Sequence, residues 1–495
     1  MKAFRVFLCV TLLIVLGLAL GINTHAAGAT EGEYWRFENG CLTITGKNSI
    51  PNISKSPWAH LQNEITSVII ESGPTFMSDH AFYDCDRLQS VTLPDTLLNI
   101  GNSAFWDCDN LREVNMQEGI TKIGKQAFFS CDALSYISFP STVTSIGDSV
   151  FANCQHLAVV YLSDSLTEIG NSAFERCLSL KKIAIPDGVT TIPQSAFSLC
   201  ENLTEVVLPQ NLTTIGEFAF HGCTKLVNIS LPDSLIEIER YAFSECSSLT
   251  EIHIPDGVTG LPSGVFSFCK KLRTITLSAN TTYISDQVFT NCVSLTSITL
   301  PASIQDIYYS PFEGCTSLEA IHITDIVAWS NIDFSDRHSN PLSLGAKLYV
   351  NGELLTDLVL PEGITSISAF CFSGCDTLQS VVIPEGVTQI GVHAFANCTN
   401  LQRLSLPSTM QSIYPGAFKG CTNLKYGYFY GSTEQFSQLR VSEDNDALLT
   451  ISWQLTIRAM LPGLLSSAII SDVCSIIPIA LGLIIYFIHK KRNPF

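Results

Sequence analysis

The stretch 203–223, LTEVVLPQNLTTIGEFAFHGC, contains the features that decide the fold of this chain. Its opening L-x-x-V-x-L spacing predicts a short strand whose apolar side chains point inward. Pro209 ends this strand, because proline has no N–H to donate to a sheet ladder. The first third of the stretch therefore predicts one short strand followed by an enforced turn.

The second half of the same stretch predicts how the unit closes. An apolar pair, Leu212 and Ile215, precedes Gly216, where we expect the chain to turn tightly. Phe220 and Cys223 follow within one short segment, for which we expect a helical or 3₁₀ turn. The unit is thus a single coil with one strand and one compact turn.

This unit recurs along the chain at a constant spacing, equal to the number of residues from Cys85 to Cys108. Eleven cysteines follow one another at that spacing from Cys85 to Cys315, and after a longer gap three more run from Cys375 to Cys421. A phenylalanine stands three positions before each of them. A fixed period between 20 and 50 residues is typical of a solenoid, in which each unit buries its apolar side against its neighbours. We predict a β-rich solenoid with one short parallel strand per coil.

The repeated phenylalanines and cysteines have structural interpretations. An aromatic at a fixed place in every coil predicts a buried stack rather than a ligand-binding stripe. Disulfides need converging Cβ atoms about 3.8 Å apart, which parallel neighbours at strand spacing do not offer. No C-x₂-C pair is matched by a second pair, so no metal site is indicated. We expect buried free thiols, and no cofactor of any kind.

Both ends of the chain carry membrane-type segments. Lys2 and Arg5 precede an apolar run and small residues, which is typical of a secretory signal peptide over residues 1–27. Residues 459–488 are strongly apolar and are followed by a basic cluster, which predicts a transmembrane helix and a short cytoplasmic tail at 489–495. The expected location is the cell membrane, with single-pass type I topology and an extracellular ectodomain.

The ectodomain divides into repeats and non-repeat modules. The expected parts are an N-terminal β cap at 28–62 with an Asn-Gly hairpin, eleven repeats at 63–323, an inserted module with a second hairpin at 324–354, three repeats at 355–424, and a C-terminal cap module at 425–458. The two modules resemble each other, because Trp329 and Phe334 are echoed by Phe436 and Val441 at the same mutual spacing. They are either caps or protruding loops that carry contacts.

Charge and motifs limit the function. The net charge is −18, so nucleic acids and other polyanions are unsuitable ligands, since they require Lys and Arg to neutralise their charge. The sequence lacks H-E-x-x-H, G-x-S-x-G, P-loop and G-x-G-x-x-G motifs. We therefore expect a protein without enzymatic activity.

A binding face is predicted on the repeated strands, where alternate side chains point outward. Tyr136, Val159 and Tyr161 form an apolar group on adjacent coils, and exposed aromatics are favoured anchors of interfaces. The alternative is ordinary variation on a sheet face, because Tyr and Val suit strands in general. The whole candidate face consists of Tyr136, Val159, Tyr161, Lys182, Glu205, Asn228, Glu251 and His253.

The unit L-x-x-I-x-L-P-x-x-V-T-x-I-G-x-x-A-F-x-x-C, seen at 180–200 and 378–398, resembles that of the BspA-like leucine-rich repeat surface proteins of bacteria. The segments N-G-C-L-T-I-T-G at 39–46 and L-Y-V-N-G-E-L at 348–354 are also similar to family members. The resemblance implies a right-handed leucine-rich repeat solenoid, no catalytic residues, and adhesion to an extracellular protein or glycoprotein of host matrix or other cells. A structural spacer of the cell envelope without a specific ligand is the alternative.

Overall fold

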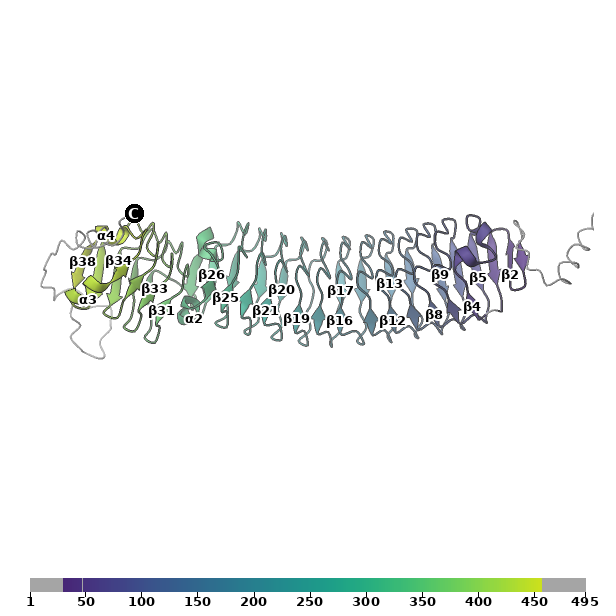
Figure 1. Cartoon of the computed structure of the whole chain (residues 1–495), viewed down its shortest axis with the longest axis horizontal. Helices are drawn as coiled ribbons and strands as arrows, with labels where there is room; N and C mark the ends of the chain where they lie inside the picture. Colours follow the sequence, from purple (N-terminus) through teal and green to yellow (C-terminus); the bar gives the residue numbers. More distant parts are fainter. Residues whose placement is uncertain (1–29, 47, 456–495) are drawn as a thin grey trace, which may run out of the picture. The chain divides into compact units, whose positions relative to one another are not determined.

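The computed structural model describes residues 30–46 and 48–455, which form a β-solenoid of leucine-rich repeat type (Figure 1). These described residues fall into two compact units, of which the first ends at Gly188 and the second begins at Val189. The signal peptide, the transmembrane helix and the cytoplasmic tail predicted from the sequence lie outside the described residues. Among the residues that the structure describes, no helix is both long and apolar enough to cross a membrane.

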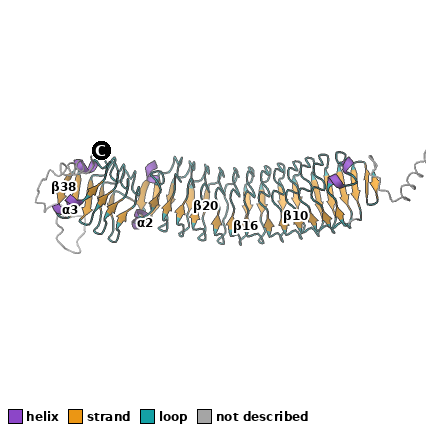
Figure 2. Cartoon of the chain, in the orientation of Figure 1, coloured by secondary structure: helices purple, strands orange, loops and turns teal. Residues whose placement is uncertain are grey.

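Most regular coils contribute two strands, so the prediction of one strand per coil was wrong (Figure 2). In the first unit, β11 pairs in parallel with β13, and β10 pairs in parallel with β12. The second strand is very short, and it forms because the x-Ile dipeptide before the repeated turn meets the same dipeptide of the next coil. A strand of this length cannot show an alternating pattern in the sequence.

The strands of the first unit form one set of first strands and one ladder of second strands. The hairpin and the first strands β1 (Glu31–Gly32), β2 (Trp35–Glu38), β3 (Cys41–Ile44), β5 (Ser67–Ile70), β7 (Ser90–Leu93) and β9 (Glu113–Met116) form one sheet, β11 (Tyr136–Ser138) and β13 (Val159–Tyr161) form another, and β15 (Lys182–Ala184) belongs to neither. The second-strand ladder contains β4 (Ser49–Ile50), β6 (Phe76–Met77), β8 (Asn99–Ile100), β10 (Lys122–Ile123), β12 (Ser145–Ile146) and β14 (Glu168–Ile169). Two 3₁₀ turns, η1 (Ile53–Lys55) and η2 (Ala59–Leu61), lie before β5.

The second unit repeats this arrangement. Its first strands are β17 (Glu205–Val207), β20 (Glu251–His253), β22 (Thr274–Thr276), β24 (Ser297–Thr299), β26 (Ala320–Ile323), β28 (Lys347–Val350), β29 (Glu353–Leu354), β30 (Asp357–Val359), β32 (Ser380–Val382), β34 (Arg403–Pro407), β36 (Tyr426–Tyr430) and β38 (Ser452–Leu455). Its second strands are β16 (Thr191–Ile192), β18 (Thr214–Ile215), β19 (Glu237–Ile238), β21 (Gly260–Leu261), β23 (Tyr283–Ile284), β25 (Asp306–Ile307), β27 (Asp333–Phe334), β31 (Ser366–Ile367), β33 (Gln389–Ile390), β35 (Ser412–Ile413) and β37 (Arg440–Val441). Its helices are α2 (Ile326–Ser330), η3 (Pro341–Leu344), α3 (Thr433–Gln438) and α4 (Ala447–Thr450).

The segment around Ala219-Phe220 is a series of tight turns, not the helical or 3₁₀ turn that we expected. Phe218 and Gly222 have left-handed backbone conformations, with φ of 56° and 69°. A left-handed residue ends any right-handed helix, so only isolated turn hydrogen bonds form, such as Cys223 N–H to Phe220 O at 3.1 Å. The turns are regular because the same two positions are left-handed in most coils.

The role expected for Gly216 also needs correction. Its φ lies outside the left-handed range, so it is not required for an unusual turn. A Cβ at this position would instead lie 2.8 Å from the backbone nitrogen of Gln194 in the preceding coil. Glycine allows the two coils to approach closely here.

The phenylalanines form the predicted buried stack. The ring centroid of Phe220 lies 5.4 Å from that of Phe197 and 5.5 Å from that of Phe243, with interplanar angles of 8° and 6°. All three rings are fully buried. The rings have no face available to a ligand, so the column is a core element.

The N-terminal hairpin is confirmed. β2 and β3 pair antiparallel across Asn39 and Gly40, whose φ angles of 50° and 82° suit a tight hairpin turn. β3 also pairs in parallel with β5, so the hairpin is hydrogen-bonded directly to the first repeat. Trp35 packs against the fully buried Trp58 with ring centroids 6.0 Å apart, which covers the end of the apolar core.

Both non-repeat modules are integrated into the ladders of the second unit. In the first module β27 pairs with β25 and β28 pairs with β26, in which Ala320 faces Lys347. In the second module β37 pairs with β35 and β38 pairs with β36. Each module is therefore a longer coil of the solenoid that accommodates a short helix, α2 or α3, and not a loop outside it. The second Asn-Gly hairpin, β28–β29, is confirmed.

Candidate functional site

All eight residues of the predicted binding face are exposed to solvent. Four of them belong to the first unit and four to the second. The group of the first unit is Tyr136, Val159, Tyr161 and Lys182, and the group of the second unit is Glu205, Asn228, Glu251 and His253. Exposure agrees with the alternation expected along a strand, since the residues between them are buried.

The structure brings the three apolar members of the first group together. Tyr136 faces Val159 in the β11–β13 ladder, and Tyr161 follows on the same face of β13. The rings of Tyr136 and Tyr161 are 5.9 Å apart with an interplanar angle of 60°. The exposed fractions of Tyr136 and Tyr161 are 50% and 59%. We call these three residues the Tyr136–Tyr161 patch.

The members in the second unit are less closely grouped. Glu251 and His253 share β20, where they face Thr274 and Thr276 of β22. Asn228 is exposed, but the strand expected around it is not formed.

The cysteines form a hydrogen-bonded column that the sequence did not reveal. The Cys246 thiol donates to the carbonyl of Phe220 at 3.2 Å, and the Cys269 thiol donates to the carbonyl of Phe243 at the same distance. Burial raises the pKa of Cys246 to about 12. All sixteen cysteines of the described residues are free thiols, and no cluster of metal-binding side chains occurs in that part of the chain. The buried thiols of the repeats are therefore structural and poorly reactive.

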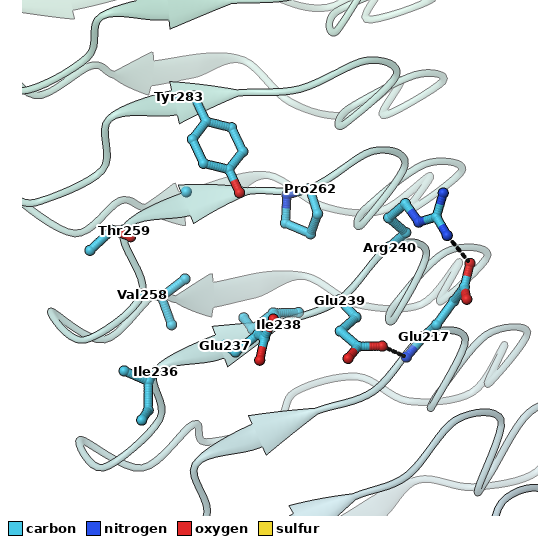
Figure 3. Close-up of a pocket in the computed structure, with 11 residues that line it drawn as sticks. Glu217, Ile236, Glu237, Ile238, Glu239, Arg240, Val258, Thr259, Pro262 and Tyr283 are labelled. Atoms are coloured by element: carbon cyan, nitrogen blue, oxygen red, sulfur yellow. Dashed lines mark hydrogen bonds and ion pairs between the residues drawn. The ribbon is translucent and has the colours of Figure 1, made fainter.

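A cavity of about 710 Å³ lies on the second strands of the second unit, away from the residues selected from the sequence (Figure 3). Its apolar lining includes Ile236, Val258 and Tyr283, and its charged lining comprises three glutamates and one arginine: Glu217, Glu237, Glu239 and Arg240. It lies beside a break in the ladder, because β19 and β21 belong to different sheets.

Proline explains this break. Glu239 donates its N–H to the carbonyl of Ile215 in the preceding coil at 2.8 Å. Pro262 occupies the equivalent position of the next coil and has no N–H to donate. The adjoining coils therefore lack one of the hydrogen bonds that join regular neighbours.

A signal for the cavity is present in the sequence: when the coils are aligned, residues that line it differ from those at the equivalent positions of the neighbouring coils. Thr213 donates its hydroxyl to the carbonyl of Thr190 at 3.0 Å, and Thr282 does the same to Thr259 at 2.9 Å. Ile236 replaces threonine in this column, and Gly260 of the following coil makes room for the ring of Tyr283. Either substitution alone is common in such repeats. Only the occurrence of both in neighbouring coils indicates a cavity.

Short parallel strands that stack coil upon coil over a common apolar core define a leucine-rich repeat solenoid, a class of typically non-catalytic binding scaffolds. The chain belongs to the family described as the BspA type leucine rich repeat region. The model of this family matches residues 75–204, 121–246, 190–319 and 343–452, which together make up more than half of the chain. The expected resemblance is confirmed, and the family is of the surface-protein type.

Several solved structures of similar proteins come from bacteria. A leucine-rich repeat protein from Bacteroides ovatus is 24% identical over 83% of this chain and 97% of its own, with a TM-score of 0.45. A leucine rich cell surface protein from Faecalibacterium prausnitzii is 24% identical over 83% of this chain and 88% of its own, with a TM-score of 0.38. One from Eubacterium ventriosum is 21% identical over 74% and 92%, with a TM-score of 0.41. No curated protein matches the chain.

Proposed function

We propose that this chain is a non-catalytic adhesin of the cell surface, which binds an extracellular protein or glycoprotein of host matrix or other cells. The observation that carries the proposal is the Tyr136–Tyr161 patch, in which two half-exposed rings lie 5.9 Å apart. Val159, with an exposed fraction of 39%, extends the apolar surface between them. Clustered exposed aromatics are the side chains that most often anchor protein interfaces.

The backbone below the patch supports this role. Tyr136 and Val159 are held in register by parallel strands, and Ile137 and Val160 between the exposed positions are buried. Because these strands are fixed before a ligand arrives, little backbone entropy is lost on binding. A tyrosine also has few rotatable bonds, so its immobilisation costs little.

The charge of the chain restricts the ligand. The sequence pI of about 4.9 disfavours binding to polyanions, as we expected. A neutral or basic protein surface, or an uncharged glycan on a glycoprotein, is compatible with this charge. Our proposal therefore names protein and glycoprotein ligands and excludes nucleic acid.

Export and anchoring complete the proposal. The sequence pattern of residues 1–27 favours secretion, and that of 459–488 favours a membrane anchor with the solenoid outside the cell. Both segments lie outside the described residues. Protease accessibility of the solenoid on intact cells, with the tail at 489–495 protected, would test this topology.

The binding function is tested with the full chain displayed on cells. Saturable binding to one member of a panel of matrix proteins, mucins and whole cells is expected. The double variant Tyr136→Ser with Tyr161→Ser should weaken it by roughly tenfold or more, because aromatic anchors contribute about 1–2 kcal/mol each. Tyr426→Ser is the matched control, since Tyr426 is a 47% exposed tyrosine on β36.

The outcome separates two functions. A loss of binding in the double variant alone supports an adhesin that uses the Tyr136–Tyr161 patch. Equal losses in the double variant and in Tyr426→Ser would contradict the assignment of the patch. If the folded, displayed chain binds no member of the panel, the function of a structural spacer is favoured instead.

A further inference from the structure

The cavity on the second strands exposes apolar side chains that have no structural need to be there. Ile236 has an exposed fraction of 60%, although threonine stands at the same position of the neighbouring coils. The hydroxyl of that threonine bonds the preceding coil, whereas isoleucine makes no such bond. Ile236 therefore provides apolar surface where a polar side chain would stabilise the solenoid equally well.

Tyr283 is held across the adjoining strand. It faces Gly260 in the β21–β23 ladder, and a Cβ at Gly260 would overlap its ring. Tyr308 makes an edge contact with the same ring at 6.5 Å and 81°. Figure 3 shows the Tyr283 ring directed toward the neighbouring coil that carries Thr259 and Pro262, where it lies over Gly260. The ring is thus partly fixed and still 36% exposed.

The charged groups of the cavity are unequally engaged. Glu217 forms an ion pair with Arg240 at 3.3 Å, and Glu239 accepts a hydrogen bond from the Glu217 N–H at 2.8 Å. Glu237 forms no ion pair within the described part of the chain. Three carboxylates against one guanidinium leave the lining acidic. Glu237, beside Ile236, is thus the carboxylate available to a cation.

We propose that this cavity binds a lysine or arginine side chain, flanked by an apolar residue, from an extended segment of a partner protein. The cationic group would pair with Glu237 and lie near the face of Tyr283, which attracts cations through its π-electrons. The methylene stem and the apolar neighbour would cover the exposed side chain of Ile236. The volume of about 710 Å³ accommodates two such side chains.

A protein segment fits the lining better than a free amine. A small amine would occupy the acidic part and leave Ile236 in water. An extended segment, whose side chains alternate in direction, can place a basic and an apolar group within a few ångströms. The missing ladder contact between β19 and β21 also leaves backbone groups near the cavity with which an extended chain can pair.

This site is distinct from the Tyr136–Tyr161 patch, which lies in the other unit and on the first strands. The inference rests on the proposed function only in taking the ligand to be a protein. Its test uses a defined peptide, so its failure can be distinguished from the failure of the adhesin proposal. The double variant of the Tyr136–Tyr161 patch should leave the affinity for this peptide unchanged.

The test measures fluorescence anisotropy of a labelled peptide of alternating leucine and lysine with the full chain. A leucine–glutamate peptide of the same length should bind at least tenfold more weakly. Glu237→Gln should weaken binding of the basic peptide about three- to fivefold, an effect that decreases with added salt. Ile236→Thr, which restores the residue of neighbouring coils, should weaken it by a similar factor.

Glu168→Gln is the matched control. Glu168 is an exposed residue at the same position of β14, preceded by Thr167 and outside the cavity. Its substitution should leave the affinity within twofold of the unmodified chain, and thermal unfolding should confirm that all variants are folded. Equal affinity for the basic and acidic peptides, or equal losses in Glu237→Gln and Glu168→Gln, would overturn the proposal. Displacement by n-butylamine at the concentration effective for the peptide would overturn the peptide assignment.

Discussion

Two regions of the second unit, the regular coils around Phe220 and the module at 324–354, satisfy the same backbone groups in different ways. In the regular coils the N–H of Phe243 donates to the carbonyl of Val265, the residue before the next phenylalanine, at 3.0 Å. The module has no Phe-x-x-Cys step to make this bond. The equivalent carbonyl at its end, that of Cys371, accepts instead from the indole of Trp329 and the side-chain amide of Asn340, both at 2.9 Å.

This difference shows how a coil can change length inside a regular array. A buried carbonyl must be hydrogen-bonded, but its donor can be either a backbone or a side-chain group. Trp329 and Asn340 reach the next coil with their side chains, so the backbone of the module is free to follow another path. The coil that joins Ala320 to its partner Lys347 can therefore be longer than a regular coil without leaving this carbonyl unpaired.

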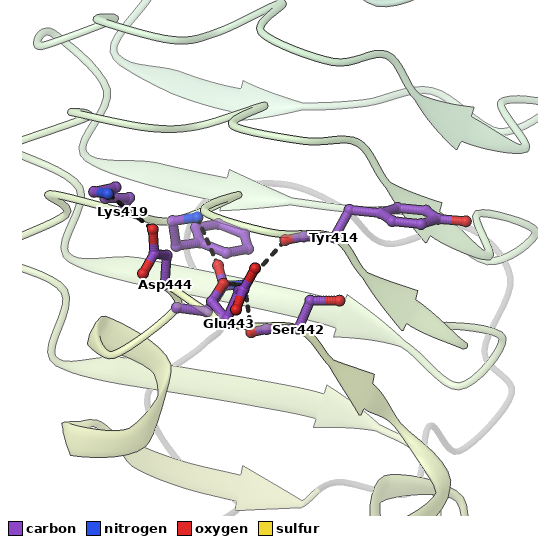
Figure 4. A network of polar contacts seen from close by, with 7 residues as sticks. Tyr414, Lys419, Ser442, Glu443 and Asp444 are labelled. Carbon is purple, nitrogen blue, oxygen red and sulfur yellow. Dashed lines mark hydrogen bonds and ion pairs between the residues drawn. The ribbon is translucent and has the colours of Figure 1, made fainter. Parts of the chain in front are cut away.

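The second module, at 425–458, also replaces a backbone group by a side chain, but here the side chain is the acceptor and not the donor. The N–H of Phe418 donates to the side-chain Oδ1 of Asn445 at 2.9 Å, in place of a carbonyl of a following regular coil. The Asn445 amide in turn donates to the carbonyl of Tyr414 at 3.0 Å. Figure 4 shows this network, with Tyr414, Ser442 and Glu443 around it and the Lys419–Asp444 ion pair of 2.8 Å beside it. Asparagine suits both modules because it carries a donor and an acceptor.

The largest expected effect concerns the regular stack. Phe220→Ala should lower the free energy of unfolding by about 3–5 kcal/mol, because it leaves a cavity between two rings. Urea unfolding followed by circular dichroism measures the total loss, and hydrogen exchange should show it concentrated in the coils of Phe197 and Phe243. A loss below about 1 kcal/mol would mean that the stack is not the main support of the regular coils.

Asn340→Ala tests the corresponding support in the module. It should cost about 1–3 kcal/mol, because the substitution removes the amide donor to the carbonyls of Phe370 and Cys371. Asn423→Ala is the control, since its amide donates to a single carbonyl, that of Thr399, at an exposed site. Equal small losses in the two variants would show that the module does not depend on its side-chain donors.

The pH dependence of stability tests the thiol column. Burial raises the pKa of Cys246 from 9.0 to about 12. Between pH 9 and 12 the unfolded chain loses this proton more readily than the folded chain, so the free energy of unfolding should fall as the pH rises. Each such thiol lowers the free energy of unfolding by up to about 1.4 kcal/mol per pH unit in this range. Below pH 9 the thiol is protonated in both states, so its full stabilising contribution is present.

Cys246→Ala should therefore make the alkaline decrease in urea stability shallower. Val265→Ala provides the comparison, because Val265 is equally buried and does not titrate. It should lower stability by the same amount at every pH. A parallel decrease in the unmodified chain and in Cys246→Ala would refute a contribution of this thiol.

The smallest effect is a difference in labelling. Cys41, in the N-terminal hairpin, is half-buried, whereas Cys246 is fully buried and hydrogen-bonded. Iodoacetamide applied to the folded chain should modify Cys41 well before Cys246, as measured by mass spectrometry of the separate peptides. In urea the two rates should become similar. Equal rates in the folded chain would contradict the protected thiol column.

The sequence predicted which residues of the candidate binding face are exposed, but not which of them lie in contact with one another. Alternation along a strand assigns Tyr136, Tyr161 and Glu251 to the outside, and the structure agrees. Which of these side chains touch depends on the ladder register and on ring orientation, so the close approach of the two tyrosines was visible only in the structure. Asn228 shows the limit, because its coil has the repeat spacing and still lacks the first strand.

The sequence by itself determined the solenoid, the buried phenylalanine stack and the two Asn-Gly hairpins, since a strict repeat places equivalent residues in equivalent environments. Only the tertiary structure revealed the second strand of each coil, the thiol-to-carbonyl bonds, and the replacement of backbone donors by Trp329 and Asn340. It also revealed the cavity at Ile236 and Tyr283, which belong to different coils. These features arise between coils, so they depend on how the side chains and backbone groups of neighbouring coils meet in space.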